Sequence, residues 1–585
     1  MLELKHLNKY FFKYKVKIII GILITIIARI FALIAPNLIG NSITLIENYL
    51  STSSLNIETI KGKLLTNILF IIGSAVIAGI FTFIMRQMLI NVSRFIEFDL
   101  KNEIYKKYQS LSFDFYKNNR TGDLMNRISE DVSKVRMYVG PAIMYTITTA
   151  SLFIIVVTYM LNVAPKLTLY TLLPLPVLSV IIYKISKIIN RKSKVVQEFL
   201  SKLTTYTQES FSGVKIIKTY VVQKYINKEL RSLAAISKEK NMSLVKVQAW
   251  FFPLMMLLIG ISNILVVYIG GLQYMNNEIE LGVLAEFIIY VNMLTWPVAT
   301  VGWVTSIVQQ AEASQKRINE FLKTKPSIIN PSTKKIDIKG EIKFDKVSLN
   351  FKETNIKALN EVSFKINKGE SIALMGDVGS GKSTLLELIC RIYDPTIGKI
   401  FLDGNDIKKI NLNELRTNIG YVPQSTFLFS DSIINNIKFG KLDASLDEVK
   451  KSVKIACLTK DIELFKEKYN TLLGERGVNL SGGQKQRLAI ARAIIKKPEI
   501  LILDDSLSAV DTETEEKILS SLNDVTKKMT VIIATHRISS AKTCDKILVL
   551  KNGSVLEFGS HEDLINKNGY YSTSYRKQSS EKEII

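Results

Sequence analysis

A glycine-rich run is the part of the sequence with the clearest chemistry. It follows an apolar segment, Ser371–Met375, that is expected to form a strand, and it precedes a helix-like segment, Thr384–Ile389. Glycines let the backbone curl so that its N–H groups point at phosphate oxygens, while Lys382 adds positive charge at the β- and γ-phosphates and the Ser383 hydroxyl suits Mg²⁺. A glycine-rich turn without a ligand is the alternative, but the flanking strand and helix favour a nucleotide. The candidate nucleotide-binding residues are Gly376, Asp377, Val378, Gly379, Ser380, Gly381, Lys382, Ser383 and Thr384.

Two acidic residues end a second apolar segment. Ile500–Leu503 is expected to be a buried strand, and Asp504 and Asp505 follow it directly. A carboxylate at such a strand end, close to a phosphate loop, can hold Mg²⁺ directly or through water. The two acids could instead only solubilise the strand end. Because a phosphate loop is present, we expect Asp504 to be a metal ligand.

A second glycine-containing helix start lies between these two stretches. Leu480-Ser481-Gly482-Gly483-Gln484 leads into an amphipathic segment, Lys485–Lys496, that Pro498 ends. Ser481, Gly482 and Gly483 would expose N–H groups at a helix N-terminus, where an anion is favoured. One chain already has its own phosphate loop, so a second phosphate-binding helix start needs a second nucleotide. This indicates a dimer.

Two further polar residues follow predicted strands. Gln424 comes after Ile419–Val422, and His536 comes after Val531–Thr535. A single histidine at a strand end is more often structural than catalytic. Because this strand is predicted to lie beside the phosphate loop, we expect His536 to contact the γ-phosphate.

The composition divides the chain into a membrane part and a soluble part. The 585 residues include 22% charged residues, and the mean hydropathy is +0.18, which excludes a uniformly disordered or fibrous protein. Residues 1–322 contain the long apolar runs, 323–339 form a linker marked by Pro326 and Pro331, and 340–585 alternate short β-branched runs with helical patterns. We therefore expect an α-helical six-span transmembrane domain followed by an α/β phosphate-loop domain with a largely parallel sheet. Six segments are long enough to cross hydrocarbon about 30 Å thick: Ile18–Ile39, Leu64–Met85, Ala142–Leu161, Leu167–Tyr183, Phe251–Ile269 and Phe287–Val308.

The distribution of basic residues between the connections predicts the orientation of these spans in the membrane. The connection Lys184–Lys246 holds 14 Lys or Arg residues and four acidic residues, whereas Gln273–Leu281 holds only the acids Glu278 and Glu280. Basic residues near span ends stay in the cytoplasm. The net charge of +24 is thus mostly a topology signal, and a nucleic-acid partner is not expected. We read the first span as retained rather than as a cleaved signal peptide.

Two cytoplasmic connections are too long for plain loops. Each has roughly 60 polar-to-amphipathic residues, and unstructured loops of that length are uncommon. Each has a glycine break near its middle, at Arg120–Asp123 and at Ser210–Gly213. We expect two long helical hairpins whose tips reach on the order of 40 Å into the cytosol.

Taken together, these residues resemble the ATP-binding cassette (ABC) transporter family, in the half-size exporter form with six spans ahead of one nucleotide-binding domain. The most specific element is Leu480–Gln484, which separates this family from kinases and GTPases. The resemblance implies that ATP and Mg²⁺ bind here and that the breaks near Gly122 and Gly213 are coupling helices. It also implies a contact with those helices for Gly474–Gly477. It implies the following roles: Phe351 stacks on adenine, Gln424 meets Mg²⁺, Ser481, Gly482, Gly483 and Gln484 close over the partner's ATP, Asp511 lies at the dimer seam, and His536 is the switch histidine.

One position departs from the family pattern. The family's usual residue after the strand-end aspartate is Glu, which orients the attacking water, and this chain has Asp505. The carboxylate is withdrawn by roughly 1 to 1.5 Å, and a displacement of about 1 Å can cost on the order of a hundredfold in rate. The resemblance then points to the degenerate-site subunit of a heterodimeric exporter with a second ABC half-transporter. Because that subunit often lacks the switch histidine, the retained His536 keeps a homodimer open.

The resemblance implies ATP-driven export of a hydrophobic or amphiphilic substrate, a drug or a lipid, from a plasma or inner membrane. An ATP-gated regulator or channel-like protein with slow hydrolysis is the alternative, and an ATPase that uses its spans only as an anchor is a third. Arg29 stands near the middle of the first span, where an unpaired cation is costly. The sequence leaves open whether Arg29 contacts an anionic or amphiphilic cargo or pairs with an internal acid.

Overall fold

The computed structural model divides the chain into two compact units. It describes residues 3–51, 57–331, 336–351, 354–526 and 529–583. One unit comprises Met1–Ser110 and Arg120–Thr324, and the other comprises Leu111–Asn119 and Lys325–Ile585. The short segment Leu111–Asn119 is thus part of the second unit, although it comes from the middle of the first in sequence.

The first unit is helical, and its six long apolar helical runs confirm the predicted spans. Several of these helices extend far beyond the apolar part: α3 has 54 residues, about 80 Å at the usual rise, so the polar connections are continuations of the spans. The helices are η1 Glu3–Leu7, α1 Asn8–Lys13, α2 Lys15–Ser51, α3 Ile57–Ser110, α5 Thr121–Asn126, α6 Val132–Met137, α7 Ile143–Val163, α8 Pro165–Leu172, α9 Pro174–Ser212, α10 Val214–Thr219, α11 Gln223–Ala249, α12 Phe251–Met275 and α13 Leu281–Lys323. Two π-helical turns, η2 Arg127–Asp131 and η3 Tyr138–Ala142, flank α6.

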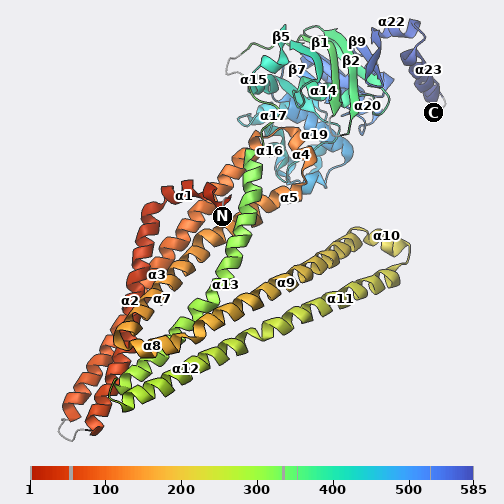
Figure 1. The fold of residues 1–585 in the computed structure, drawn as a ribbon. Helices are drawn as coiled ribbons and strands as arrows, with labels where there is room; N and C mark the ends of the chain where they lie inside the picture. Colours follow the sequence, from red (N-terminus) through yellow and green to blue (C-terminus); the bar gives the residue numbers. More distant parts are fainter. Residues whose placement is uncertain (1–2, 52–56, 332–335, 352–353, 527–528, 584–585) are drawn as a thin grey trace. The chain divides into compact units, whose positions relative to one another are not determined.

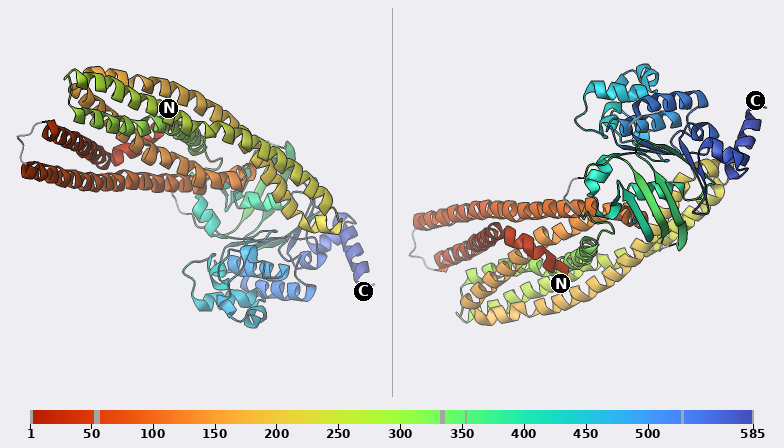
Figure 2. Two further views of the ribbon diagram at one scale, coloured as in Figure 1. Left: turned by 90° about the horizontal axis from the view of Figure 1, so that it is seen from below. Right: turned by 90° about the horizontal axis from the view of Figure 1, so that it is seen from above.

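The second long connection is the helical hairpin that the sequence predicts. α9 and α11 lie side by side over their length and are joined through α10 (Figures 1 and 2). α9 ends at Ser212, and Gly213 caps it. Figure 1 shows the α9–α11 hairpin diverging from α2, α3 and α7 within this unit. The fourth span is interrupted where α8 ends and α9 begins at Pro174, because a proline lacks the N–H that a continuous helix needs.

Small residues allow α2 and α13 to pack closely. A Cβ added to Gly282 would lie 2.0 Å from the backbone oxygen of Gly40, so neither position has room for a side chain. The Gly282 N–H donates to the Thr44 hydroxyl at 3.2 Å. Close backbone approach at small residues is a common way for membrane helices to associate.

The described residues of the second unit form two sheets. The six-stranded sheet has the order β10-β9-β3-β8-β7-β6, and all its neighbouring strands are parallel except the edge pair β9 and β10. This confirms the predicted largely parallel sheet. A four-stranded antiparallel sheet, β2-β1-β4-β5, was not predicted. The strands are β1 Ile342–Phe351, β2 Ile356–Ile366, β3 Ser371–Gly376, β4 Ile397–Leu402, β5 Asn405–Asp406, β6 Ile419–Val422, β7 Ile500–Asp504, β8 Thr530–Ala534, β9 Lys546–Lys551 and β10 Ser554–Gly559.

The central strands are buried on both faces. Every residue of β7 and β8 is buried, as continuous apolar runs in parallel strands predict. Apolar side chains form one core cluster that includes β7 and α19 and a second that includes β1, β2 and α14. The helices of this unit are α4 Phe113–Asn118, α14 Lys382–Ile389, α15 Leu412–Thr417, α16 Ile433–Lys438, α17 Leu446–Ile455, α18 Thr459–Leu464, α19 Gly482–Ile494, α20 Thr512–Thr526, α21 Ile538–Ala541, α22 His561–Asn566 and α23 Tyr570–Glu583.

Candidate functional site

The carboxyl ends of four neighbouring strands bring the predicted site residues to one edge of the six-stranded sheet. β3, β8, β7 and β6 are adjacent and parallel in this order. The phosphate loop follows β3, His536 follows β8, Asp504 and Asp505 come at the end of β7, and Gln424 follows β6. In open parallel sheets this edge is where ligands bind.

These residues line one pocket. Its lining includes Lys117, Phe351, Val378, Gly379, Ser380, Gly381, Lys382, Ser383, Thr384, Gln424, Asp504, Asp505 and His536. Ser481, Gly482, Gly483, Gln484 and Asp511 are not among the lining residues. The structure thus separates the predicted residues into a set that shares a pocket and a set that lies elsewhere in the same unit.

Two positions of the phosphate loop require glycine both for their backbone conformation and for lack of space. Gly376 and Gly381 have φ values of +141° and +100°. A Cβ on Gly376 would lie 2.1 Å from the Leu550 backbone oxygen, and one on Gly381 would lie 2.7 Å from the Ala358 backbone oxygen. These left-handed conformations form the curl that precedes α14, whose first residue is Lys382.

The cationic and hydroxyl groups of the loop are held close to a buried carboxylate. The Lys382 ammonium donates to the backbone oxygens of Gly376 and Asp377 at 2.8 and 2.9 Å, and burial lowers the pKa of Lys382. The Ser383 hydroxyl donates to Asp504 Oδ1 at 3.0 Å. Burial of Asp504 raises the pKa of its carboxyl. A hydroxyl next to a carboxylate fits a hard oxygen-preferring cation such as Mg²⁺, which also takes phosphate oxygens as ligands.

Asp505 has a strained backbone. Its φ is +45°, which is uncommon for a residue with a side chain and is concentrated at functional sites. The Asp505 N–H donates to the Ala534 backbone oxygen at 3.0 Å, and its carboxylate accepts from Gln424 Nε2 at 3.2 Å. The candidate water-orienting carboxylate is therefore positioned by the strand that also carries His536.

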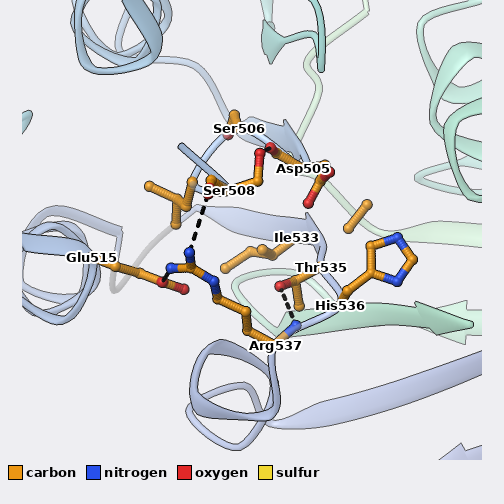
Figure 3. Close-up of a pocket in the computed structure, with 10 residues that line it drawn as sticks. Asp505, Ser506, Ser508, Glu515, Ile533, Thr535, His536 and Arg537 are labelled. Atoms are coloured by element: carbon orange, nitrogen blue, oxygen red, sulfur yellow. Dashed lines mark hydrogen bonds and ion pairs between the residues drawn. The ribbon is translucent and has the colours of Figure 1, made fainter. Parts of the chain in front are cut away.

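Behind these residues, Arg537 joins two loops (Figure 3). Its guanidinium donates to the backbone oxygens of Ser508 and Val510, each at 3.1 Å, and pairs with the buried Glu515. Figure 3 shows a second pocket, which shares Asp505 and His536 with the first; the His536 ring and the Asp505 carboxylate lie on one side of it, and the Arg537 side chain points to the other. Sequence reasoning did not identify Arg537. Its only local signal is its position directly after His536.

The C-terminal helix α23 also forms hydrogen bonds to the loop that carries His536. The Gln578 side chain donates to the His536 backbone oxygen and accepts from the Ile538 N–H, both at 2.9 Å. At the start of the same helix, the Tyr570 hydroxyl donates to Asp377 Oδ1 of the phosphate loop at 2.7 Å. Sequence reasoning missed these residues because nothing in their spacing marks them.

The second glycine-containing segment forms a capped helix start. Ser481 is the N-cap of α19: its hydroxyl accepts from the Gln484 N–H at 3.2 Å, while the Gln484 side chain accepts from the Ser481 N–H at 2.9 Å. A Cβ on Gly483 would lie 2.9 Å from the Ala509 backbone oxygen, so this helix start packs against the loop that follows Asp505. Asp511 accepts from the Thr514 N–H at 2.9 Å.

Phe351 also lines the pocket and lies beside Lys117 of the segment Leu111–Asn119. The Lys117 ammonium of α4 lies 4.4 Å from the centre of the Phe351 ring, and Tyr393 meets that ring edge-on at 5.4 Å. The residue that the resemblance assigns to adenine thus carries a cation on one face.

The comparisons with known proteins agree in both parts of the chain. Residues 18–298 match the family model for the ABC transporter transmembrane region, and residues 359–508 match the ABC transporter model. The chain is 35% identical over 579 residues to the multidrug resistance-like ATP-binding protein MdlA of Buchnera aphidicola subsp. Baizongia pistaciae, covering 98% of this chain and 99% of that protein. It is 33% identical to the probable multidrug resistance ABC transporter ATP-binding/permease protein YheI of Bacillus subtilis, over 98% and 97% of the two chains.

A solved structure shares the fold. A bacterial Atm1-family ABC exporter with ATP bound superposes with a TM-score of 0.79 at 24% sequence identity, over 98% of both chains. The relatives and the two matched regions describe an ATP hydrolase coupled to export, a multi-pass protein of the inner membrane with a cytoplasmic ATPase domain. The chain therefore belongs to the ABC transporter family, as a half-size exporter with one transmembrane region and one ATPase domain.

Proposed function

We propose that two half-transporters enclose ATP between them and that this enclosure drives export of a hydrophobic or amphiphilic substrate by alternating access. One observation carries the proposal: the pocket holds the phosphate loop, both strand-end aspartates, Gln424 and His536, but not the helix start at Ser481. A phosphate-binding helix start that lies outside its own chain's pocket is available to a neighbour's nucleotide. ATP then acts as a ligand with unequal affinity for the open and enclosed states, which shifts the equilibrium between them.

Within one chain the pocket residues have different roles in binding and hydrolysing ATP. Phe351 stacks on the adenine, and the loop from Gly376 to Thr384 cradles the phosphates. Mg²⁺, when bound, neutralises charge on the phosphate oxygens, and Ser383, Gln424 and Asp504 are the groups that would hold it. Asp505, Gln424 and His536 orient the attacking water and contact the γ-phosphate. Ser481, Gly482, Gly483, Gln484 and Asp511 serve the partner's nucleotide.

The partner is proposed to be a second, different half-transporter. Asp505 makes this chain's own site slow, while its helix start at Ser481 is capped and ordered, so it can complete a faster site on a partner that carries Glu. The relatives named for multidrug resistance support a small amphiphilic cargo, a drug or a lipid.

Transport by the reconstituted transporter tests the proposed function. The chain, isolated from its host membrane with whatever partner accompanies it, is placed in liposomes with a fluorescent amphiphilic dye on both sides. Export predicts that ATP moves the dye against its gradient and that vanadate stops this movement. ATP-dependent leak down a gradient without uphill movement would instead show a gated channel-like protein and contradict export.

Gln578 is expected to influence turnover without touching ATP. Its side-chain amide fixes the backbone on both sides of Arg537, so Gln578→Ala should let the His536 loop move and lower kcat by about tenfold, with little change in KM. Ser580→Ala is the matched control, because among the described residues the Ser580 hydroxyl bonds only within α23, to the backbone oxygens of Arg576 and Lys577. Steady-state kinetics separate the two constants. A change in KM alone, or equal effects of both variants, would contradict this role.

A further inference from the structure

Arg29 lies deep in the first span, at about the level of the bilayer centre. It follows Ile18 by 11 residues in α2, which places it roughly 16 Å into the apolar part of the helix. An arginine at this depth is costly unless it faces the bundle or a cavity and meets a partner.

Arg29 lies on the side of α2 that packs against other spans. Thr25 and Leu33, one turn before and one turn after it, are 0% and 8% exposed, whereas the next residue, Ile30, is 50% exposed. Residues four apart lie on one face of a helix. Leu33 belongs to a buried cluster with residues of α7, α12 and α13. Arg29 thus borders the interior of the helical unit and does not point wholly to lipid.

Arg29 has no counter-ion in the part of the chain that the structure describes. Its Nε atom is buried and has no hydrogen-bond partner there. Glu286 of α13, in the same unit, is by contrast a buried residue with hydrogen-bond partners. It is 4% exposed, and its carboxylate accepts from the Tyr290 hydroxyl at 2.7 Å and from Asn37 Nδ2 at 3.2 Å. Asn37 is two turns further along α2, about 12 Å along the helix from Arg29. The Glu286 carboxylate is therefore hydrogen-bonded at a different level of the helix from Arg29.

We propose that Arg29 binds the anionic head group of an amphiphilic substrate. The inference rests on the proposed export function and adds the charge of the cargo to it. A guanidinium presents a planar fork of donors that matches a phosphate or carboxylate in two bonds, and in apolar surroundings such a pair is strong. Ile26 and Ile30, which neighbour Arg29 on α2 and are 37% and 50% exposed, provide apolar surface for an acyl chain or another hydrophobic tail. The ligand class is a monoanionic or dianionic amphiphile with the head group held within the membrane.

The test compares lipid-like probes that differ only in charge. The full-length transporter in liposomes is titrated with lysophosphatidic acid, with lysophosphatidylcholine of the same acyl chain and with inorganic phosphate, and stimulation of ATP turnover is measured. The wild type should respond to lysophosphatidic acid at the lowest concentration and should not respond to inorganic phosphate, since the tail contributes to binding.

Substitutions at Arg29 make the test specific. Arg29→Gln should raise the half-saturating concentration of lysophosphatidic acid by roughly thirtyfold or more, because a buried anion would lose its partner. Arg29→Lys should raise it by about threefold, since the charge stays but the fork is lost. Arg86→Gln is the control, because Arg86 is exposed on the neighbouring α3. Basal turnover should be unchanged in all three variants.

Several results would overturn the inference. The inference is wrong if the wild type prefers lysophosphatidylcholine. It is also wrong if Arg29→Gln responds to lysophosphatidic acid as the wild type does, or if the only effect of the substitution is loss of association with the partner. The proposed export function fails separately, if the wild type shows the charge preference but moves no dye against its gradient.

Discussion

Asp505→Glu is expected to raise ATP turnover at this chain's own phosphate loop by up to about a hundredfold, because the longer side chain moves the carboxylate towards the attacking water by roughly 1 to 1.5 Å. Asp505 already has the right neighbours for this role. Its carboxylate bonds to Gln424, its backbone is fixed to the strand before His536, and it lines the nucleotide pocket. Only the length of the side chain departs from the family pattern. Steady-state hydrolysis measures the effect in a transporter whose partner is inactivated by Glu→Gln at its own matching position, so that only this chain's site turns over.

The matched control for this change is Asp504→Glu. Asp504 accepts a hydrogen bond from Ser383 at 3.0 Å and is 4% exposed, so a longer side chain there has no room and should lower turnover. Opposite effects of the same chemical change at adjacent positions are therefore expected. If turnover by Asp505→Glu is unchanged or lower, the length of the side chain is not the cause of slow hydrolysis at this site.

Lys382→Ala is expected to lower turnover at this chain's own phosphate loop by roughly a hundred- to a thousandfold, since it removes a positively charged donor from the phosphates in a site shielded from water. The Lys382 ammonium is held by the backbone oxygens of Gly376 and Asp377, so it is confined to the loop before any phosphate binds. Binding of a fluorescent ATP analogue and hydrolysis are both measured. Lys368→Ala, the same loss of charge at an exposed position, should leave both unchanged.

An effect of Lys382→Ala on folding is excluded by the thermal unfolding midpoint of the transporter in detergent. The variant should unfold as the wild type does in the absence of nucleotide and should lose the stabilisation that ATP gives. Normal hydrolysis in this variant would show that the phosphates are bound elsewhere.

The sequence predicted those parts of the fold that have strong local signals. The six apolar runs form six spans, and β3, β6, β7 and β8 lie within one residue of their predicted bounds at every end. The pocket residues could be named because parallel strands place their carboxyl ends at one edge. The antiparallel sheet was missed because the pairing of its strands depends on residues far apart in the chain, such as Phe344 of β1 with Ile400 of β4.

The supporting residues could not be predicted for a similar reason. Arg537 acts through Glu515, and Gln578 acts on the backbone of a residue 42 positions earlier. Neither contact leaves a spacing pattern. The two alternatives for Arg29 likewise needed the structure, because only tertiary packing decides whether a membrane-embedded charge finds an acid.

We expect a bound nucleotide to become enclosed only when a neighbouring chain supplies the helix start at Ser481. The direct measurement is native mass spectrometry of the transporter after ATP is trapped with vanadate and Mg²⁺. Trapped nucleotide should be found only in complexes of two chains, either two copies of this 66.1 kDa protein or one copy with a second half-transporter. Nucleotide trapped with equal yield in a single chain would contradict the account.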